Sequence, residues 1–194
     1  MRQLAKQHPG QQPGQRGFTL VELMVVLAIA AILFSIAVPN FNEMVERNRR
    51  EGVMTDFSAT IQTARSEAAR SNKSVIMCAS TDGAQCGGAD WATGWILFTD
   101  KNNNQQFDSG ATNDGDIVES VRKLPTGYTI TPTTGEFTSW IQFRSTGEVL
   151  GNNGGSSGRF RICSIDADPT HAKYLALSAV GQLRLDKMNG DTCP

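Results

Sequence analysis

The chain has 194 residues and a mass of 21.0 kDa, enough for one modest domain core. Its 18 basic and 19 acidic residues give a net charge of −1, which excludes a globally basic nucleic-acid-binding protein. Two histidines leave little for histidine-based catalysis or a multi-histidine metal site. The composition therefore disfavours an enzyme and indicates a structural or adhesive protein without a cofactor.

The charge is unevenly distributed along the chain. Residues 1–17 contain Arg2, Lys6 and Arg16 but no acid, so residues 18–194 carry 15 basic and 19 acidic groups, a net charge of −4. If residues 1–17 are removed to give the mature protein, residues 18–194 are acidic, and this net charge disfavours an anionic partner.

Residues 18–38 form an apolar run of 21 positions, of which only Thr19, Glu22 and Ser35 are not apolar. A helix of this length can cross a bilayer core of about 30 Å. A secretory signal peptide has a shorter apolar run and a small-residue cleavage site, which is missing here. A plain membrane anchor leaves Glu22 unexplained, because an ionised carboxylate in hydrocarbon costs about 2.5 kcal/mol or more and requires a partner.

Residues 17–22, GFTLVE, resemble the class III signal of type IV pilins and type II secretion pseudopilins. The resemblance implies that a prepilin peptidase cuts after Gly17 and methylates the new amine of Phe18. Glu22 is then the fifth mature residue, which pairs with the cationic N-terminus of a neighbouring subunit during filament assembly. Pro39 lies where many pilins have a proline that bends the first helix. An ordinary transmembrane anchor is the alternative.

The resemblance also implies where the protein works. Residues 1–17 are a leader peptide, residues 18–38 cross the inner membrane once, and the head is periplasmic until the subunit enters a pilus filament at the cell surface. The implied partners are the prepilin peptidase, other minor pilins and the major pilin.

A helix is predicted to continue past Pro39 and to end at Ser71–Asn72, so that it covers residues 18–72. An apolar face recurs every three or four positions at Met54, Phe57, Ile61, Ala64 and Ala68. Gly52 weakens this helix by roughly 1 kcal/mol relative to alanine. A solvated face is predicted for the charged residues between them, namely Glu46, Arg47, Arg49, Arg50, Glu51, Arg65, Glu67 and Arg70.

Three of these residues, Arg47, Arg49 and Arg50, form a cluster next to the apolar segment. Contact with phospholipid headgroups or with acidic neighbours is one interpretation. A solvated turn of helix is the favoured one.

From residue 73 the pattern changes to strands. With no second strong helical pattern, the runs predict antiparallel sheets packed on one helix, an α+β fold whose head covers residues 73–194. Residues 151–158, GNNGGSSG, predict an exposed linker-like turn. Eight short β-like runs are bounded by Gly, Pro, Asn or Asp: 74–79, 94–100, 116–121, 128–131, 140–143, 159–164, 174–178 and 182–186.

Four cysteines, Cys78, Cys86, Cys163 and Cys193, lie beyond the apolar segment. A periplasmic domain is oxidising, so disulfides are expected, and three pairings are possible. We favour Cys78–Cys86, which closes a short loop, and Cys163–Cys193, which ties the C-terminus to a strand. Zinc is the alternative, but there is no C-x-x-C pair and no histidine near these cysteines.

Residues 100–108, DKNNNQQFD, match part of a calcium-binding loop. The glycine expected at position six is Gln105 and the glutamate expected at position twelve is Ala111, so a polar hairpin loop without a metal is the favoured interpretation. Oxygen-bearing side chains occupy positions one, three, five and nine of the loop, at Asp100, Asn102, Asn104 and Asp108.

Catalytic motifs are missing from the sequence: there is no P-loop, GxGxxG or G-x-S-x-G pattern. His171 follows Asp168-Pro169-Thr170 in a turn-like setting, where a solvated or hydrogen-bonded histidine is expected. Trp91, Trp95 and Trp140 are expected to pack in the core or in loops rather than to form ligand platforms.

The head resembles the GspH/FimT/FimU group of minor pilins and pseudopilins. The resemblance is carried by residues 95–100 (WILFTD), the polar loop after them, residues 161–163 (RIC) and residues 177–184 (LSAVGQLR). It implies a minor pilin that primes filament assembly or forms a tip complex with other minor pilins. Pro39 favours the type IV pilus, and a pseudopilin of a type II secretion system is an alternative.

A second alternative is a DNA-binding pilin for natural transformation, because some FimT-like members bind DNA through a near-terminal G-R-x-R motif. Here that place reads GQLR at residues 181–184, which lacks the first arginine, and GRFR at residues 158–161 lies earlier. A solvated sheet face is the favoured interpretation, since losing one arginine weakens a small phosphate-binding patch. The candidate DNA contacts are Arg159, Arg161, Arg184 and Lys187.

Overall fold

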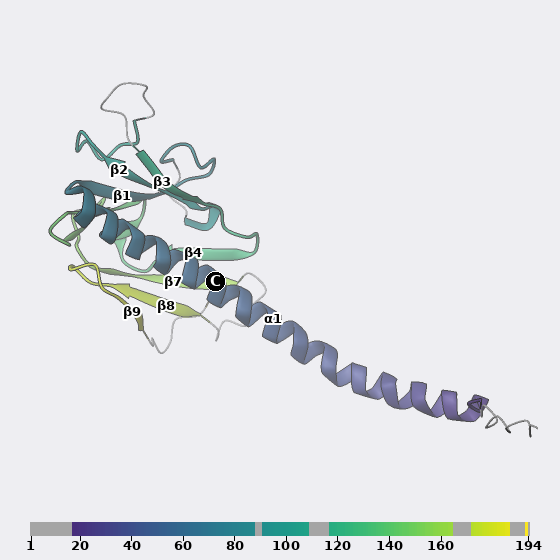
Figure 1. Cartoon of the computed structure of the whole chain (residues 1–194). Coiled ribbons are helices and arrows are strands. Elements are labelled where there is room, and N and C mark those ends of the chain that lie inside the picture. The colour runs from purple at the N-terminus through teal and green to yellow at the C-terminus, as the bar shows by residue number, and fades with distance from the viewer. Residues whose placement is uncertain (1–16, 88–90, 109–116, 165–171, 187–192, 194) are drawn as a thin grey trace, which may run out of the picture. The chain divides into compact units, whose positions relative to one another are not determined.

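A computed structural model describes residues 17–87, 91–108, 117–164, 172–186 and 193. Its longest element is the 52-residue helix α1 (Leu20–Ser71). The chain divides into two compact units, Met1–Met44 and Val45–Pro194, and the division falls within α1. The helix therefore contributes residues 45–71 to the globular head, which is the second unit (Figure 1).

The ends of α1 are set by local side-chain and backbone chemistry. Thr19 caps the start, because its hydroxyl accepts the backbone N–H of Glu22 at 3.2 Å and its carbonyl accepts that of Leu23 at 3.1 Å. At the other end Asn72 has a φ of 53°, a left-handed conformation that terminates helices. The predicted end at Ser71–Asn72 is confirmed. The helical assignment continues through Pro39, and a bend there stays a prediction.

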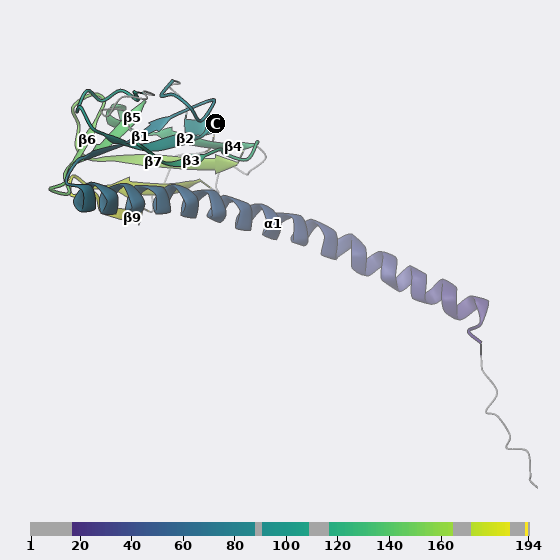
Figure 2. The same ribbon diagram turned by 45° about the horizontal axis from the view of Figure 1, so that its top comes forward.

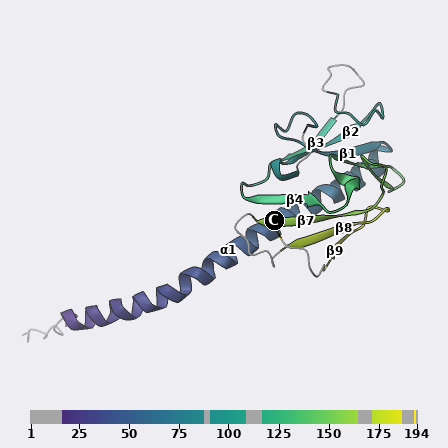
Figure 3. The ribbon, with the colours of Figure 1, turned by 180° about the vertical axis from the view of Figure 1, so that it is seen from behind.

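Two antiparallel sheets form the rest of the head, so the predicted α+β fold is confirmed (Figures 1 and 3). In sheet order the first sheet consists of β3 (Ile117–Arg122), β2 (Trp95–Asp100), β1 (Ser74–Ala79), β5 (Trp140–Phe143) and β6 (Val149–Gly151). The second sheet consists of β4 (Tyr128–Pro132), β7 (Gly158–Ser164), β8 (Lys173–Leu177) and β9 (Leu183–Asp186). Two short 3₁₀ turns are η1 (Trp91–Thr93) and η2 (Gly135–Phe137).

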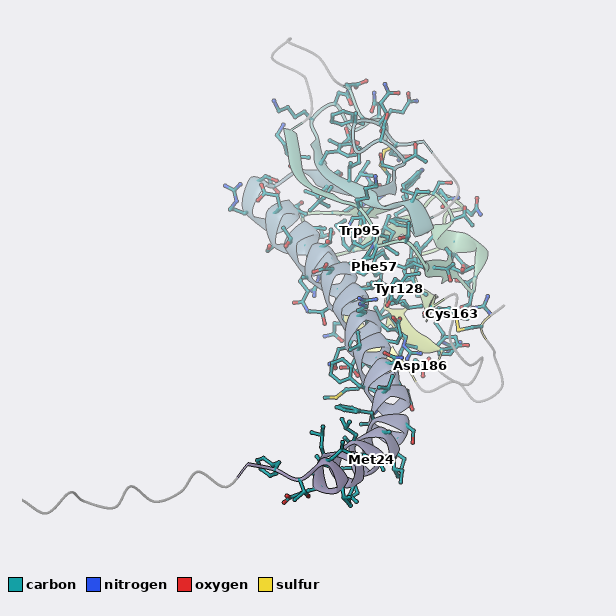
Figure 4. The ribbon with its side chains drawn as sticks, turned by 90° about the vertical axis from the view of Figure 1, so that its right-hand side faces the viewer. Met24, Phe57, Trp95, Tyr128, Cys163 and Asp186 are labelled. Atoms are coloured by element: carbon teal, nitrogen blue, oxygen red, sulfur yellow. A yellow bond between two sulfur atoms is a disulfide. The ribbon has the colours of Figure 1, made fainter. Side chains whose placement is uncertain are left out.

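The main core lies between α1 and the inner faces of both sheets (Figure 2). Phe57, Ile61, Ala64 and Ala68 of α1 are fully buried, which confirms the predicted apolar face. Phe57 is central, because its ring makes edge contacts with Trp91, Trp95 and Phe160. Figure 4 shows Phe57 and Trp95 between the helix and the strands.

The indole N–H groups of both buried tryptophans have hydrogen-bond acceptors within the head. Trp91 Nε1 donates to the Phe137 carbonyl at 2.9 Å, and Trp95 Nε1 donates to Thr60 Oγ1 at 3.1 Å. Their predicted role in core packing is confirmed. Trp140 is half-buried and packs on a second, smaller cluster.

That second cluster covers the outer face of the first sheet. It consists of Ile76, Cys78, Ile96 and Phe98, with Phe107 and Trp140 packed against them. Alternate residues of β1 therefore face two different cores, Val75 and Met77 inward and Ile76 and Cys78 outward. This explains why β1 and β2 are apolar at nearly every position.

The middle of the glycine-rich stretch 151–158 is an exposed turn, as its composition predicts, but its two ends belong to β6 and β7 and are packed. Gly151 belongs to β6 and is buried, and a Cβ atom there would lie 1.9 Å from the carbonyl oxygen of Glu136. At Gly158 a Cβ would lie 2.8 Å from the ring of Phe137. These glycines allow the β6–β7 connection to pack directly on η2. β6 itself was missed because three residues give no readable alternation.

We expect Gly151→Ala to lower the free energy of unfolding of the head by about 1–3 kcal/mol, because backbone must move to admit the methyl group. Gly52→Ala is the matched control. No atom lies within 4 Å of a Cβ at that helical position, so this change should raise stability by about 0.5–1 kcal/mol. Urea unfolding of the full-length protein in detergent micelles, followed by tryptophan fluorescence, measures both. Equal effects of the two changes would contradict the packing of this stretch.

Candidate functional site

The N-terminal unit presents an accessible backbone followed by an apolar helix. Gly17 and Phe18 precede the first helical residue and are exposed, with Phe18 at 82 %. The large apolar side chains from Leu20 to Val38 are also exposed, as the sticks around Met24 illustrate (Figure 4). By length and composition this part of α1 can cross a membrane. Such a surface requires lipid or other apolar helices around it.

Glu22 is the third residue of α1 and is exposed on the isolated chain. Its backbone N–H is bound by Thr19, so Thr19 and Glu22 occupy the positions of a capping box. A carboxylate in the first helical turn interacts favourably with the helix dipole. The same carboxylate stands in an apolar segment, where an ionised group is costly without a partner.

At the base of the head, α1 is joined to the second sheet by a hydrogen bond. The Tyr128 hydroxyl donates to Glu46 Oε2 at 2.9 Å, and Glu46 also forms an ion pair with Arg49 at 3.1 Å. Burial and the Glu46 carboxylate both raise the pKa of the Tyr128 hydroxyl above its ordinary value of 10.0. Figure 4 shows Tyr128 beside the helix.

The prediction of a uniformly solvated charged face on α1 is wrong at four positions. Arg50 is only 4 % exposed, and Glu46, Arg65 and Glu67 are half-buried. Arg50 lies seven residues before Phe57 and Arg65 lies four after Ile61, so helical geometry places both beside the apolar face. A buried Arg50 is also unable to contact lipid headgroups as one cluster with Arg47 and Arg49.

The strand register brings three of the four candidate DNA contacts to one face of the second sheet. Arg159 is opposite Ala176, which is opposite Arg184, and Arg161 lies two residues along the strand from Arg159. The face is not a continuous basic patch, because Arg159 Nε binds Asp186 Oδ2 at 2.7 Å. Lys187, like His171, lies outside the described residues.

Both disulfides follow the favoured pairing of the four cysteines. Cys78 is bonded to Cys86 and closes a short loop, and Cys163 of β7 is bonded to Cys193. Within the short loop Asp82 accepts the backbone N–H groups of Ala84 and Gln85, which lower the pKa of its carboxyl group. The disulfides therefore close one loop and tie Cys193 to β7.

The polar loop at residues 100–108 is organised by internal hydrogen bonds. Asp100 is 2 % exposed, and its carboxylate accepts the backbone N–H groups of Asn103, Asn104 and Gln105. Asp108 accepts the side-chain amides of Asn102 and Asn104. These hydrogen bonds order residues 100–108 as a polar loop, and the interpretation without a metal stays a prediction. Ala111 lies outside the described residues.

The sequence pattern missed a small pocket between α1 and the β8–β9 turn. The pocket has a volume of about 240 Å³ and is lined by Gln62, Arg65, Gly181, Gln182, Leu183 and Arg184. Arg65 is assigned to the solvated face by its charge, and Gly181 reads as an ordinary turn residue. Their sequence separation hides the contact, since only the tertiary fold places the turn on the helix.

Comparisons with known proteins agree with this architecture. The family model described as type II transport protein GspH matches residues 54–181, about two thirds of the chain, and the model described as prokaryotic N-terminal methylation motif matches residues 12–38. The crystal structure of the type IV minor pilin FimU of Pseudomonas aeruginosa is similar with a TM-score of 0.52 and 19 % identity, covering 74 % of this chain and 92 % of that chain. At this identity the likeness concerns the fold alone.

Two curated relatives have sequences similar to part of this chain. The type IV major pilin protein PilA of Myxococcus xanthus is 47 % identical over 47 residues, 24 % of this chain and 21 % of its own length. The pilin-like protein PilA1 of Thermus thermophilus is 32 % identical over 96 residues, 50 % of this chain and 55 % of its own. The matched regions therefore cover less than two thirds of these relatives.

We expect Tyr128→Phe to lower the free energy of unfolding by about 1 kcal/mol at pH 7, because one hydrogen bond to Glu46 is lost. The pKa of Tyr128 is raised in the folded state, so the unfolded chain ionises first and this stabilisation decreases as the pH rises through 10. Urea unfolding at pH 7 and pH 11 measures the difference between wild type and variant, which should shrink at the higher pH.

Glu46→Gln serves as the control for this prediction. It removes the charge but leaves Tyr128 buried, and burial is the larger cause of the raised pKa, so part of the pH dependence should remain. A wild-type advantage that grows between pH 7 and pH 11 would contradict the assignment.

Proposed function

Because the chain belongs to the family described as type II transport protein GspH and carries the prokaryotic N-terminal methylation motif, we propose that it is a minor pilin of a type IV pilus. The protein is not an enzyme but a filament subunit. It primes assembly or forms a tip complex with other minor pilins and is followed in the filament by the major pilin.

One observation carries this proposal: a carboxylate five residues after a Gly–Phe junction, inside an apolar helix. Cleavage after Gly17 creates a new amine at Phe18, and methylation leaves it cationic. The amine of one subunit pairs with Glu22 of its neighbour, which removes the cost of an unpaired charge in apolar surroundings. Exposure of Gly17 and Phe18 supports access by a prepilin peptidase.

The order of membrane insertion and filament assembly follows from the apolar character of the first part of α1 and the polar surface of the head. The apolar part of α1 first holds the subunit in the inner membrane, with the head in the periplasm. Assembly then exchanges lipid for the apolar helices of neighbouring subunits, and the head becomes part of the filament surface. Pro39 supports the pilus assignment, since a bend at this position adapts the helix to a filament core.

The two disulfides support a periplasmic and extracellular location, because such bonds persist in oxidising compartments. A pseudopilin of a type II secretion system would share the fold and the motif. The two assignments are separated by identifying the proteins that co-purify with the full-length chain from sheared filaments. Pilins among these proteins support the pilus assignment. Secretion pseudopilins alone overturn it.

We expect Gly17→Ala to block processing, because the peptidase recognises the glycine before the cleaved bond. The immature chain then retains residues 1–17 and an unmethylated Phe18. Intact-mass measurement of the membrane-extracted protein distinguishes the two forms. A normally cut and methylated chain would refute the assignment of the cleavage site.

Glu22→Ala should permit processing but reduce incorporation into filaments at least tenfold, because the cationic N-terminus of the neighbouring subunit loses its partner. Immunoblots of sheared filaments against cell-associated protein measure incorporation. Glu51→Ala, a change at an exposed acid of the same helix, is the matched control and should incorporate normally. Normal incorporation of Glu22→Ala would contradict the proposed pairing of Glu22 with the N-terminus of the neighbouring subunit.

A further inference from the structure

We propose that the pocket between α1 and the β8–β9 turn binds a carboxylate side chain of a neighbouring filament subunit. This inference rests on the proposed function for the identity of the partner. The binding chemistry itself follows from the residues that line the pocket, above all Arg65 and Arg184.

The turn that forms one wall is held rigidly. Ser178 N–H donates to the Gln182 carbonyl at 2.9 Å, and Gln182 N–H donates to the Ser178 hydroxyl at 3.0 Å. The Ala179 carbonyl accepts Val149 N–H of the other sheet at 2.9 Å. These bonds fix the conformation of the turn that contains Gly181 and its position relative to β6.

Arg65 lies directly across this turn. A Cβ atom at Gly181 would come within 2.7 Å of both Cδ and Nε of Arg65, so only glycine leaves the arginine its place, and the φ of 70° at Gly181 also favours glycine. The Arg65 side chain is half-buried, and its Nε is buried without a hydrogen-bond partner among the described residues. A partly desolvated guanidinium with an unused donor is a binding site for an oxyanion.

The lack of an acidic lining residue distinguishes this pocket from the larger polar pocket of the head. Within the described ranges, neither Arg65 nor Arg184 has an ion-pair partner, and no acid lines the pocket. The larger polar pocket at Lys73 and Arg144 also contains Asp100 and Glu148. Elsewhere in the described ranges arginines do pair with carboxylates, as in Arg49–Glu46, Arg70–Glu67, Arg144–Glu148 and Arg159–Asp186.

The surroundings favour a protein carboxylate over nucleic acid. A phosphate backbone requires several cations in a row, whereas Arg159 beside this site is already neutralised by Asp186. Two large apolar side chains are exposed on the described part of the head, and both are neighbours of pocket residues in the sequence: Val180 precedes Gly181 in the turn, and Leu185 follows Arg184 on β9. Arginine is enriched among the residues that contribute most to protein interfaces.

The first test uses full-length protein in detergent micelles, labelled with ¹⁵N-arginine. The peptide Ac-Ala-Glu-Ala-NH₂ is titrated at constant ionic strength, and NMR follows the Nε–Hε signal that disappears in Arg65→Gln. We expect a saturable shift with the glutamate peptide and none with Ac-Ala-Gln-Ala-NH₂. An unchanged signal, or equal shifts with both peptides, overturns the proposal.

Variants assign the effect to the pocket. Arg184→Gln should weaken binding of the glutamate peptide at least threefold. Arg70→Gln, which removes an exposed arginine of the same helix that is paired with Glu67, should change the affinity less than twofold. Equal weakening by the two variants would overturn the pocket as the site. Unfolding curves of each variant verify that the head is folded.

A 12-nucleotide oligothymidylate tests the competing ligand class. If it shifts the Arg65 signal at lower concentration than the glutamate peptide and loses affinity steeply with salt, the site belongs to nucleic acid and the protein assignment is overturned. Weaker binding than that of the peptide supports the carboxylate.

The partner is identified in filaments by a benzophenone amino acid at Gln182, an exposed residue of the pocket rim. We expect a crosslink to a pilin segment that contains an Asp or Glu. A subunit present in filaments that crosslinks to no pilin overturns the assigned partner. A chain that binds the peptide in micelles but never enters filaments overturns the proposed function while leaving the pocket chemistry intact.

Discussion

The packing of Phe57 holds the head together, because this single ring contacts both sheets from the helix. Its edge contacts with Trp95 on the first sheet and with Phe160 on the second have centroid distances of 5.2 and 4.9 Å. The buried side chains of both sheets that face α1 belong to one shared core cluster, together with those of the helix. The head part of α1 is therefore a structural requirement for the two sheets, and the helix is more than a stalk that carries a domain.

One helix consequently meets two environments with two different residue patterns. Up to Val38 nearly every position is apolar, which suits lipid or a bundle of apolar helices. Beyond residue 45 one face is apolar and packs on the sheets, while charged residues occupy much of the remaining surface. Because one helix spans both parts, Glu22 and the sheet-packing residues lie on a single element, which begins two residues after Phe18.

The charged groups of the head are of two kinds: some are paired through local helix geometry, and others are paired through tertiary contacts. Pairs three or four residues apart, such as Arg70–Glu67, follow from helix geometry alone. Arg159–Asp186 and Tyr128–Glu46 join residues distant in sequence and depend on strand register and helix docking. Arg65 differs from both kinds of group, since folding half-buries it without supplying an acid.

The sequence by itself determined the processing motif, the apolar segment, the apolar face of the second half of α1 and most strands. These features follow from residue periodicity and short-range chemistry, which depend on neighbours along the chain. The favoured disulfides could also be proposed from loop closure and compartment. Tertiary structure alone decided the burial of Arg50 and Arg65, the close packing of Gly151 on η2, and the pairing of Arg159 with Asp186. Each of these depends on which distant segment approaches the residue, and charge or composition at the residue itself does not encode that approach.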